Sequence, residues 1–293
     1  MPVADSQVNH FVLRVSCADQ VGIVAAVSGF FAERGFSIVE SSQHTEPGSQ
    51  QFFMRTLLSG EGQSEAAMAD IHEAFDTLTK PFGITWSLRA TTDKLKTVLA
   101  VSKWDHCLKD LLHAWRTGDL PLDVVAVVSN HNDLAPMAEW YGVPFHHLPV
   151  TPETKPQQEA QMLKVMEETG SELMLLARYM QILSDDLCRK LEGRAINIHH
   201  SFLPGFKGAK PYHQAYEKGV KLVGATAHYV TADLDEGPII EQDVFRVAHS
   251  DDVNVLVAAG RQVESRVLMR AAKWHAEGRV MLTNSRRTVV FDR

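Results

Sequence analysis

The chain has 293 residues, of which 45% are hydrophobic and 22% charged, a composition typical of globular proteins and sufficient for two ordinary domains. A formal net charge of −7 without a Lys/Arg-rich run argues against nucleic acid as a partner. Three cysteines without CxxC spacing, together with no signal-peptide pattern and no long apolar segment, predict a reduced, cytoplasmic protein without a membrane partner.

The first 90 residues predict six elements in the order β-α-β-β-α-β. Residues 9–16 alternate between apolar and polar side chains, which is typical of a half-buried strand. Apolar residues at helical spacing follow over 21–34, and Gly35 ends this predicted helix. The remaining predicted elements are strands at 37–44 and 50–58, a helix at 66–78 and a strand at 84–88. This order matches the ferredoxin-like plan, a sheet with two helices on one face.

The passage from Asp19 to Ser41 resembles ACT domains, regulatory modules that bind amino acids, and we assign residues 1–90 to this unit. The resemblance implies an effector site beside the first turn and a homo-oligomer, a dimer or tetramer. The residues that match the effector site are Asp19, Gln20, Val21, Gly22 and Ile23. A plain oligomerisation module is the alternative, because a fold alone does not fix a function.

Residues 91–94 form a polar linker, and the pattern changes over 95–293. Continuous apolar runs at 96–101 and 124–128 are typical of strands buried on both faces. Strands and helices that alternate predict an open, mostly parallel, Rossmann-like sheet with its active crevice at the carboxyl ends of the strands. Without GxGxxG or a P-loop, no cofactor is expected. Further predicted elements are helices at 107–115, 135–140, 157–169, 185–190 and 253–274, strands at 145–148, 173–176, 195–199, 224–230 and 237–244, and a hairpin at 280–282 and 288–291.

Reactive polar residues concentrate between Ile196 and Asp243. Asn197 and His199 alternate along a predicted strand, so their side chains point to the same side. Asp235 lies in a loop that ends at a Gly-Pro break. Taken singly, these residues are typical of a capping asparagine, a core histidine and an Asx-turn. Taken together, they indicate a site, because reactive polar groups converge at sites.

The sequence Asn197-Ile198-His199, the loop from Leu203-Pro204 to Lys207-Gly208, and Asp235-x-Gly237 resemble the signature of folate-dependent formyltransferases over residues 95–293. The resemblance implies that Asn197, His199 and Asp235 are catalytic and that the segment 176–183 holds a pterin ring. The implied folate-binding residues are Arg178, Tyr179, Met180, Gln181, Ile182, Leu183, His200 and Gly205. No metal site is implied.

Other polar residues near this signature are open to two interpretations. Lys207 and Lys210 either meet the glutamate tail of folate or are solvated loop charges. His200 either positions water or excludes an amine, or it makes a structural hydrogen bond. We interpret His213 and His228 as structural.

The loop after the first strand of the second domain distinguishes branches of this family. Glycinamide ribonucleotide formyltransferases carry a Gly- and Ser-rich loop that grips a phosphate. Residues 102–107 contain no glycine here, and Asp105 would repel a phosphate. Together with the ACT-like unit and the pair His199-His200, this resembles the deformylase branch. That resemblance implies hydrolysis of 10-formyltetrahydrofolate to formate and tetrahydrofolate, formate supply for purine biosynthesis, balanced one-carbon pools, and control by methionine and glycine.

The expected mechanism is attack of water on the formyl carbon. Asn197 would donate a hydrogen bond to the developing oxyanion, and an imidazolium at His199 would donate a second one. Asp235 would stabilise that imidazolium and orient or deprotonate the water, and the sequence leaves these two roles open. Three alternatives remain: a formyltransferase with an amine acceptor, a metal hydrolase built from the clustered histidines, and a non-catalytic amino-acid sensor.

Overall fold

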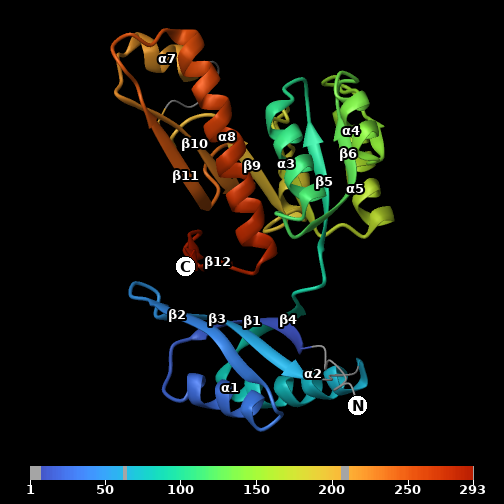
Figure 1. Cartoon of the computed structure of the whole chain (residues 1–293), viewed down its shortest axis with the longest axis vertical. Helices are drawn as coiled ribbons and strands as arrows, with labels where there is room; N and C mark the ends of the chain where they lie inside the picture. The colour runs from blue at the N-terminus through green and yellow to red at the C-terminus, as the bar shows by residue number, and fades with distance from the viewer. Residues whose placement is uncertain (1–7, 62–64, 206–210, 293) are drawn as a thin grey trace, which may run out of the picture. The chain divides into compact units, whose positions relative to one another are not determined.

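The computed structural model describes residues 8–61, 65–205 and 211–292. It divides into two compact units, Met1–Asp93 with Glu277–Arg293, and Lys94–Ala276 (Figure 1). Among the described residues, no helix has the length and apolar character needed to cross a bilayer.

The first unit is an antiparallel sheet with strand order β2-β3-β1-β4, and α1 and α2 cover one face of it (Figure 1). Its elements are β1 (Val8–Ala18), α1 (Ile23–Ala32), β2 (Ser37–Glu46), β3 (Gln51–Glu61), α2 (Glu65–Thr79), the 3₁₀ helix η1 (Lys80–Phe82) and β4 (Thr85–Ala90). The predicted β-α-β-β-α-β order is confirmed. The predicted helix at 21–34 begins later, at Ile23, because Gly22 adopts a left-handed φ of 100°.

The last residues of the chain fold with the first unit. β12 (Val280–Leu282) and β13 (Thr288–Val290) form the predicted hairpin. Met281 and Phe291 bury Phe53, which belongs to a different core cluster from its neighbours Phe52 and Met54 because successive strand residues face opposite ways. The hairpin therefore covers the apolar face of the sheet around Phe53. The second domain that we expected at 95–293 ends earlier, at Ala276, because the residues after it fold with the first unit.

The second unit is built on a seven-stranded sheet with the order β11-β10-β9-β8-β5-β6-β7. The strands from β9 to β7 are parallel, whereas β10 and β11 are antiparallel to their neighbours. The elements are β5 (Leu95–Val101), α3 (His106–Thr117), β6 (Leu122–Ser129), α4 (Ala135–Tyr141), β7 (Phe145–His147), α5 (Lys155–Thr169), β8 (Leu173–Leu176), α6 (Asp185–Lys190), β9 (Ala195–His199), α7 (Pro211–Glu217), β10 (Leu222–Tyr229), β11 (Ile239–Arg246) and α8 (Val253–Ala276). The predicted open, mostly parallel sheet is confirmed, and α7 is an element that the sequence did not predict.

Three neighbouring parallel strands, β5, β8 and β9, end at the same edge of this sheet. The segments that follow Val101, Leu176 and His199 therefore leave the sheet side by side. Most buried side chains of these strands are apolar, with Val98, Ala100 and Leu176 in one buried cluster. Polar side chains at this edge are therefore held in place by a packed sheet.

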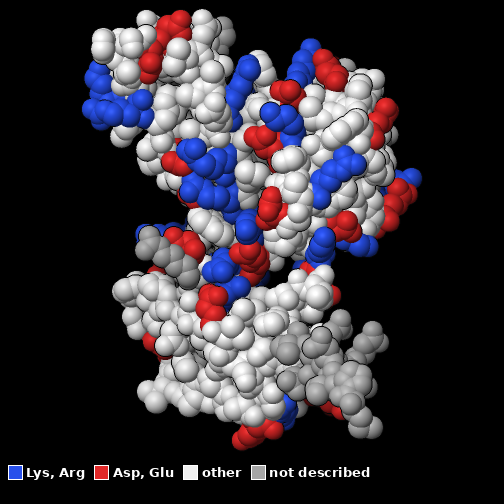
Figure 2. All heavy atoms as spheres, viewed as in Figure 1, with Lys and Arg blue, Asp and Glu red and all other residues white. Residues whose placement is uncertain are grey.

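Charged side chains of both signs lie close to one another over the second unit on the face that Figure 2 shows. That face carries no extended basic surface of the kind that binds a phosphate backbone.

Candidate active site

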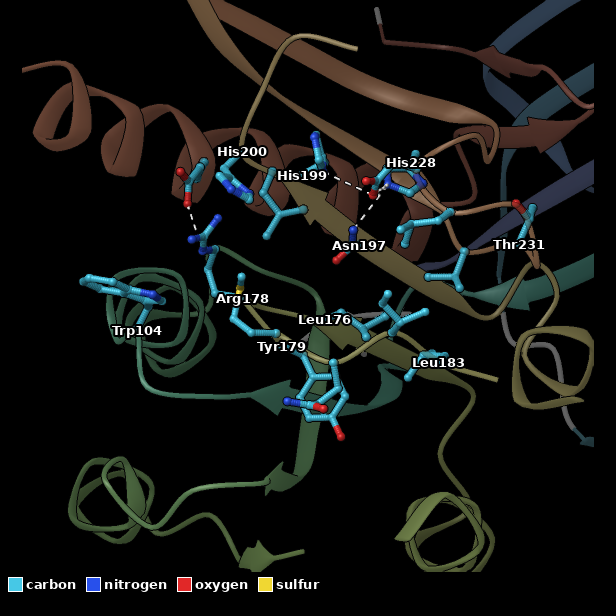
Figure 3. Close-up of a pocket in the computed structure, with 18 of the residues that line it drawn as sticks. Trp104, Leu176, Arg178, Tyr179, Leu183, Asn197, His199, His200, His228 and Thr231 are labelled. Atoms are coloured by element: carbon cyan, nitrogen blue, oxygen red, sulfur yellow. Dashed lines mark hydrogen bonds and ion pairs between the residues drawn. The ribbon is translucent and has the colours of Figure 1, made fainter. Parts of the chain in front are cut away.

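A cavity of about 670 Å³ opens at the carboxyl ends of β8 and β9. Asn197 and His199 on β9 line it together with Asp235, which lies in the loop between β10 and β11 (Figure 3). The three residues therefore share one cavity, although Asp235 is far from the others in the sequence.

An ion pair joins the histidine to the carboxylate. His199 Nδ1 lies 3.1 Å from Asp235 Oδ1, and both side chains are largely buried. Burial alone would raise the pKa of Asp235, but the hydrogen bond and charge of His199 outweigh it and hold that pKa below its ordinary value. Because the carboxylate can only accept, Nδ1 carries the proton. The buried Nε2 of His199 has no hydrogen-bond partner among the described residues, so it is the ring atom that remains for a substrate.

A second histidine holds the amide. His228 Nδ1 lies 2.9 Å from the Tyr229 carbonyl oxygen, to which it must donate. Burial lowers the pKa of His228, so the ring is neutral and its Nε2 accepts from Asn197 Nδ2 at 3.3 Å. This contact fixes the orientation of the Asn197 amide. The residue that we interpreted as structural from sequence thus contacts a candidate catalytic group directly.

The position of Asp235 depends on a glycine two residues later. A Cβ on Gly237 would lie 1.7 Å from the Tyr229 carbonyl oxygen, so only glycine permits this close approach. The approach also allows Tyr229 N to donate to Pro238 O at 2.9 Å. The Asp-x-Gly spacing therefore anchors the loop directly onto the end of β10.

The loop after β9 is anchored to β10 as well. Thr226 Oγ1 donates to Ser201 O at 2.9 Å and accepts from Leu203 N at 3.0 Å. His200 lines the cavity, whereas Gly205 does not, so the geometry brings only the first of these predicted folate residues to the pocket. Lys207 and Lys210 lie outside the described residues.

The predicted pterin segment does reach the cavity, since every residue from Arg178 to Leu183 lines it. Met180 N donates to Ser102 Oγ at 2.9 Å, which ties the segment to the end of β5. The Tyr179 hydroxyl accepts from Gln158 Nε2 at 2.7 Å inside the core. Met180 and Ile182 expose large apolar surfaces, as expected of a wall that packs against a flat ring.

Further polar residues that line the cavity were not predicted from the sequence; they are Trp104, His106, Tyr212, Arg261 and Glu264. Two features of the sequence could have indicated some of these residues. Trp104 and His106 follow β5, where the carboxyl-end rule places binding loops. Glu264 lies four residues from both Gly260 and Leu268, on the buried stripe of α8.

The potential metal ligands of the site give little support to the alternative of a metal hydrolase. In the described part of the chain, the histidines near Asp235 do not form a ligand group, whereas His106, Cys107 and Glu264 bring ligand atoms within 4.8 Å of one another. Burial raises the pKa of the Cys107 thiol, which therefore stays protonated. Both Glu264 oxygens already accept hydrogen bonds, from His106 and Tyr212.

Comparison with known proteins shows which chains share this architecture. Residues 95–272 match the formyl transferase family model, and residues 11–76 match the ACT domain model. A formyltetrahydrofolate deformylase from Corynebacterium sp. (strain P-1) is 49% identical over 97% of this chain and 99% of its own length.

Solved structures agree with these sequence matches. The crystal structure of formyltetrahydrofolate deformylase from Burkholderia mallei ATCC 23344 has a TM-score of 0.92 at 49% identity, covering 97% of this chain and 99% of that one. Glycinamide ribonucleotide transformylase 1 from Symbiobacterium toebii has a TM-score of 0.63 at 31% identity, covering 67% of this chain and 94% of that one.

The site predicts a pH dependence of stability. Burial, with a smaller effect from the nearby Arg178 charge, lowers the pKa of His200 from 6.5 to about 4. As pH falls below 6.5, the unfolded chain binds this proton before the folded chain does, so folded-state stability decreases. Replacing the imidazole in His200→Asn should make this decrease shallower between roughly pH 6.5 and 5, as measured by denaturant unfolding at several pH values.

The matched control is Gln181→Asn, which changes an exposed, non-titratable side chain of the same cavity and should leave the pH dependence unchanged. His228 contributes in the same direction as His200, so a residual slope is expected. Equal slopes in the wild type and His200→Asn would contradict this assignment.

Proposed function

The chain belongs to the formyltetrahydrofolate deformylases, and we propose that Asn197, His199 and Asp235 are the catalytic groups with which it hydrolyses 10-formyltetrahydrofolate to formate and tetrahydrofolate. The observation that carries the residue assignment is the 3.1 Å contact between His199 and Asp235 in the cavity that Asn197 also lines.

The chemistry follows from the donors in this cavity. Attack of water on the formyl carbon places negative charge on the formyl oxygen, which needs fixed hydrogen-bond donors. Asn197 supplies an amide N–H whose orientation His228 fixes, and His199 supplies Nε2 when the ring is charged. Asp235 stabilises that charged ring and orients the attacking water or accepts a proton from it.

The substrate fits the cavity with its ring on the apolar side. Leu176, Ile182, Leu183 and Val230 supply apolar walls, and the backbone of segment 178–183 supplies polar groups for ring nitrogens. The formyl group then points toward Asn197 and His199. Gly205 stays a predicted folate contact, although it does not line this cavity.

The runner-up function is transfer of the formyl group to an amine, the reaction that the name of the Symbiobacterium protein indicates for that relative. Both reactions need the same oxyanion donors and differ only in the nucleophile. Free formate in the absence of any amine distinguishes them.

Purified protein incubated with 10-formyltetrahydrofolate alone should release formate and tetrahydrofolate in equal amounts. Asn197→Ala should lower kcat by about 10²–10³ because an oxyanion donor is lost. Asp235→Asn should lower kcat by about 10²–10⁴ through loss of acid–base chemistry. The measurement is formate released over time.

Glu236→Gln, next to Asp235 but outside the cavity lining, is the matched control and should retain wild-type turnover. A strict requirement for an amine acceptor would refute hydrolysis. Full turnover of Asp235→Asn would instead refute the residue assignment and leave the family activity in place.

We propose that the first unit binds methionine and glycine beside the turn of Asp19, Gln20, Val21, Gly22 and Ile23. Thr45 Oγ1 donates to Asp19 Oδ2 at 3.1 Å, and Gln20 Nε2 donates to Phe82 O at 2.9 Å, so the turn is well anchored. Control by these amino acids would match formate release to purine biosynthesis and to the one-carbon pool.

Titration of methionine and glycine against deformylase rate should therefore change the rate in a saturable manner. Gly22→Ala should weaken this response, because alanine disfavours the φ of 100° that shapes the turn. A flat response of the wild type to both amino acids would contradict the proposal.

We propose that the chain forms a homo-oligomer through the same region. Val21 is 100% exposed, and Val24, Ile38 and Val39 expose further apolar surface around α1 and the outer strand β2. Few charged side chains lie on the part of the first unit that Figure 2 shows. An edge strand beside exposed apolar residues favours pairing with a second copy.

Light scattering during size-exclusion chromatography should give a dimer or tetramer for the wild type. Val39→Lys should shift the equilibrium toward the monomer, because the charge must be desolvated at the interface. Leu282→Lys, at an exposed apolar position of the same unit outside this group, is the control and should leave the oligomer unchanged. A wild-type monomer at micromolar concentration would refute the proposal.

A further inference from the structure

The cavity has two chemically different sides, with Asn197 and His199 between them (Figure 3). On one side lie Leu183 and Thr231, and the apolar residues there fit the folate ring. On the other side lie Trp104, Arg178 and His200. The folate ring and the residues assigned to catalysis do not explain why this second side is polar.

A buried charge network forms the wall of this polar side. The Glu264 side chain is 1% exposed and accepts hydrogen bonds from His106 Nε2 at 2.8 Å and from the Tyr212 hydroxyl at 2.7 Å. Burial raises the pKa of Glu264, but the His106 hydrogen bond and the Arg178 charge outweigh it, so the group stays ionised.

Arg178 faces Glu264 without being satisfied by it. Its Nε lies 3.4 Å from Glu264 Oε2, close enough for an ion pair but without hydrogen-bond geometry. Nε and Nη1 are both buried and have no hydrogen-bond partner within residues 8–61, 65–205 and 211–292, and the side chain is only 9% exposed. A guanidinium carries five N–H donors, and a buried donor that makes no hydrogen bond destabilises the folded state.

Two unfavourable backbone features accompany this network. Arg178 adopts a left-handed φ of 66°, a conformation that is strained for a non-glycine residue. Gly260 stands in the interior of α8, because a Cβ there would lie 2.2 Å from Tyr212 Cζ and would displace the ring from Glu264. Such costs gather where a ligand is bound.

We infer that Arg178 forms a subsite for a small carboxylate anion, the formate that the reaction produces; this inference rests on the proposed function. Arg178 lines the cavity, and an ionised carboxylate is the acceptor that a guanidinium fork matches best. Burial lowers the pKa of the neighbouring His200, which is therefore neutral at physiological pH. The arginines that line the cavity are Arg178 and Arg261, and Arg261 stacks on Trp104.

The course of the reaction brings formate to this side. Folate occupies the apolar side, so the water that attacks the formyl carbon comes from the polar side. A C–O bond to water forms, the C–N bond to folate breaks, the folate nitrogen takes one proton, and a second proton leaves as formate ionises. The oxygen that came from water then points toward Arg178, which stabilises the new carboxylate.

Formate binding to the full-length enzyme without folate tests this subsite. The probe is sodium formate, followed by saturation-transfer NMR and matched with sodium chloride at equal ionic strength. Arg178→Gln should weaken formate binding at least tenfold, and Arg178→Lys, which keeps the charge but loses the planar fork, should weaken it less. Arg261→Gln is the matched control, since Arg261 lines the same cavity but stacks on Trp104 at 4.5 Å, and it should keep wild-type affinity.

Glu264→Gln distinguishes a binding role from a structural one. Removal of the neighbouring carboxylate should tighten formate binding several-fold, the opposite of the change in Arg178→Gln. If Arg178→Gln fails to fold, Arg178→Lys and Glu264→Gln still decide between the roles. Wild-type affinity in both Arg178 variants, weaker binding in Glu264→Gln, or no formate binding by the wild type would overturn the subsite.

Deformylase turnover, measured on the same preparation, separates this proposal from the function on which it rests. Turnover without formate binding overturns the subsite alone. Formate binding without turnover overturns the proposed function and leaves a carboxylate site at Arg178.

Discussion

The contact between His199 and Asp235 is the interaction on which the catalytic assignment depends. It joins the end of β9 to a loop beyond β10, and it needs both strands to be paired in the observed register, with His199 opposite Thr226. Gly237 allows the loop to reach the Tyr229 backbone, and this contact holds Asp235 in place. A shift in any of these backbone segments would separate the carboxylate from the imidazole and leave a buried charge without its partner.

Much of this arrangement could be predicted from residue patterns. Alternation along 195–199 correctly placed Asn197 and His199 on the same side of a strand, and continuous apolar runs correctly predicted a mostly parallel sheet. Sequence patterns did not show that residues 277–293 fold with the first unit, because the need to cover Phe53 arises only after the sheet has formed. Nor did they show the contact between His228 and Asn197, which depends on the pairing of β9 with β10.

Several residues of the polar side were missed for a similar reason. His106, Tyr212 and Glu264 come from three separate segments, and none of them belongs to a compact motif. Arg178 was predicted, but as a folate contact within segment 176–183. Glu264 did carry a signal, since a carboxylate on the buried stripe of a helix needs partners. The identity of those partners depends on how α8 packs in the second unit, which residue spacing does not specify.

The two polar groups of the cavity have complementary electrostatic roles. Between the two sides of the cavity, Asn197, His199 and Asp235 form a set that includes an imidazole and a carboxylate, the groups that acid–base steps use. On the polar side, Arg178 keeps its charge throughout the reaction, as the binding of an anion requires. The apolar wall beyond them excludes water from the folate ring and strengthens both interactions.

The origin of the oxygen atoms in the released formate tests the central claim most directly. Turnover of 10-formyltetrahydrofolate in ¹⁸O-labelled water should give formate with one oxygen from the solvent and one retained from the formyl group, as mass spectrometry would show. Formate that contains no solvent oxygen would contradict attack by water at this site.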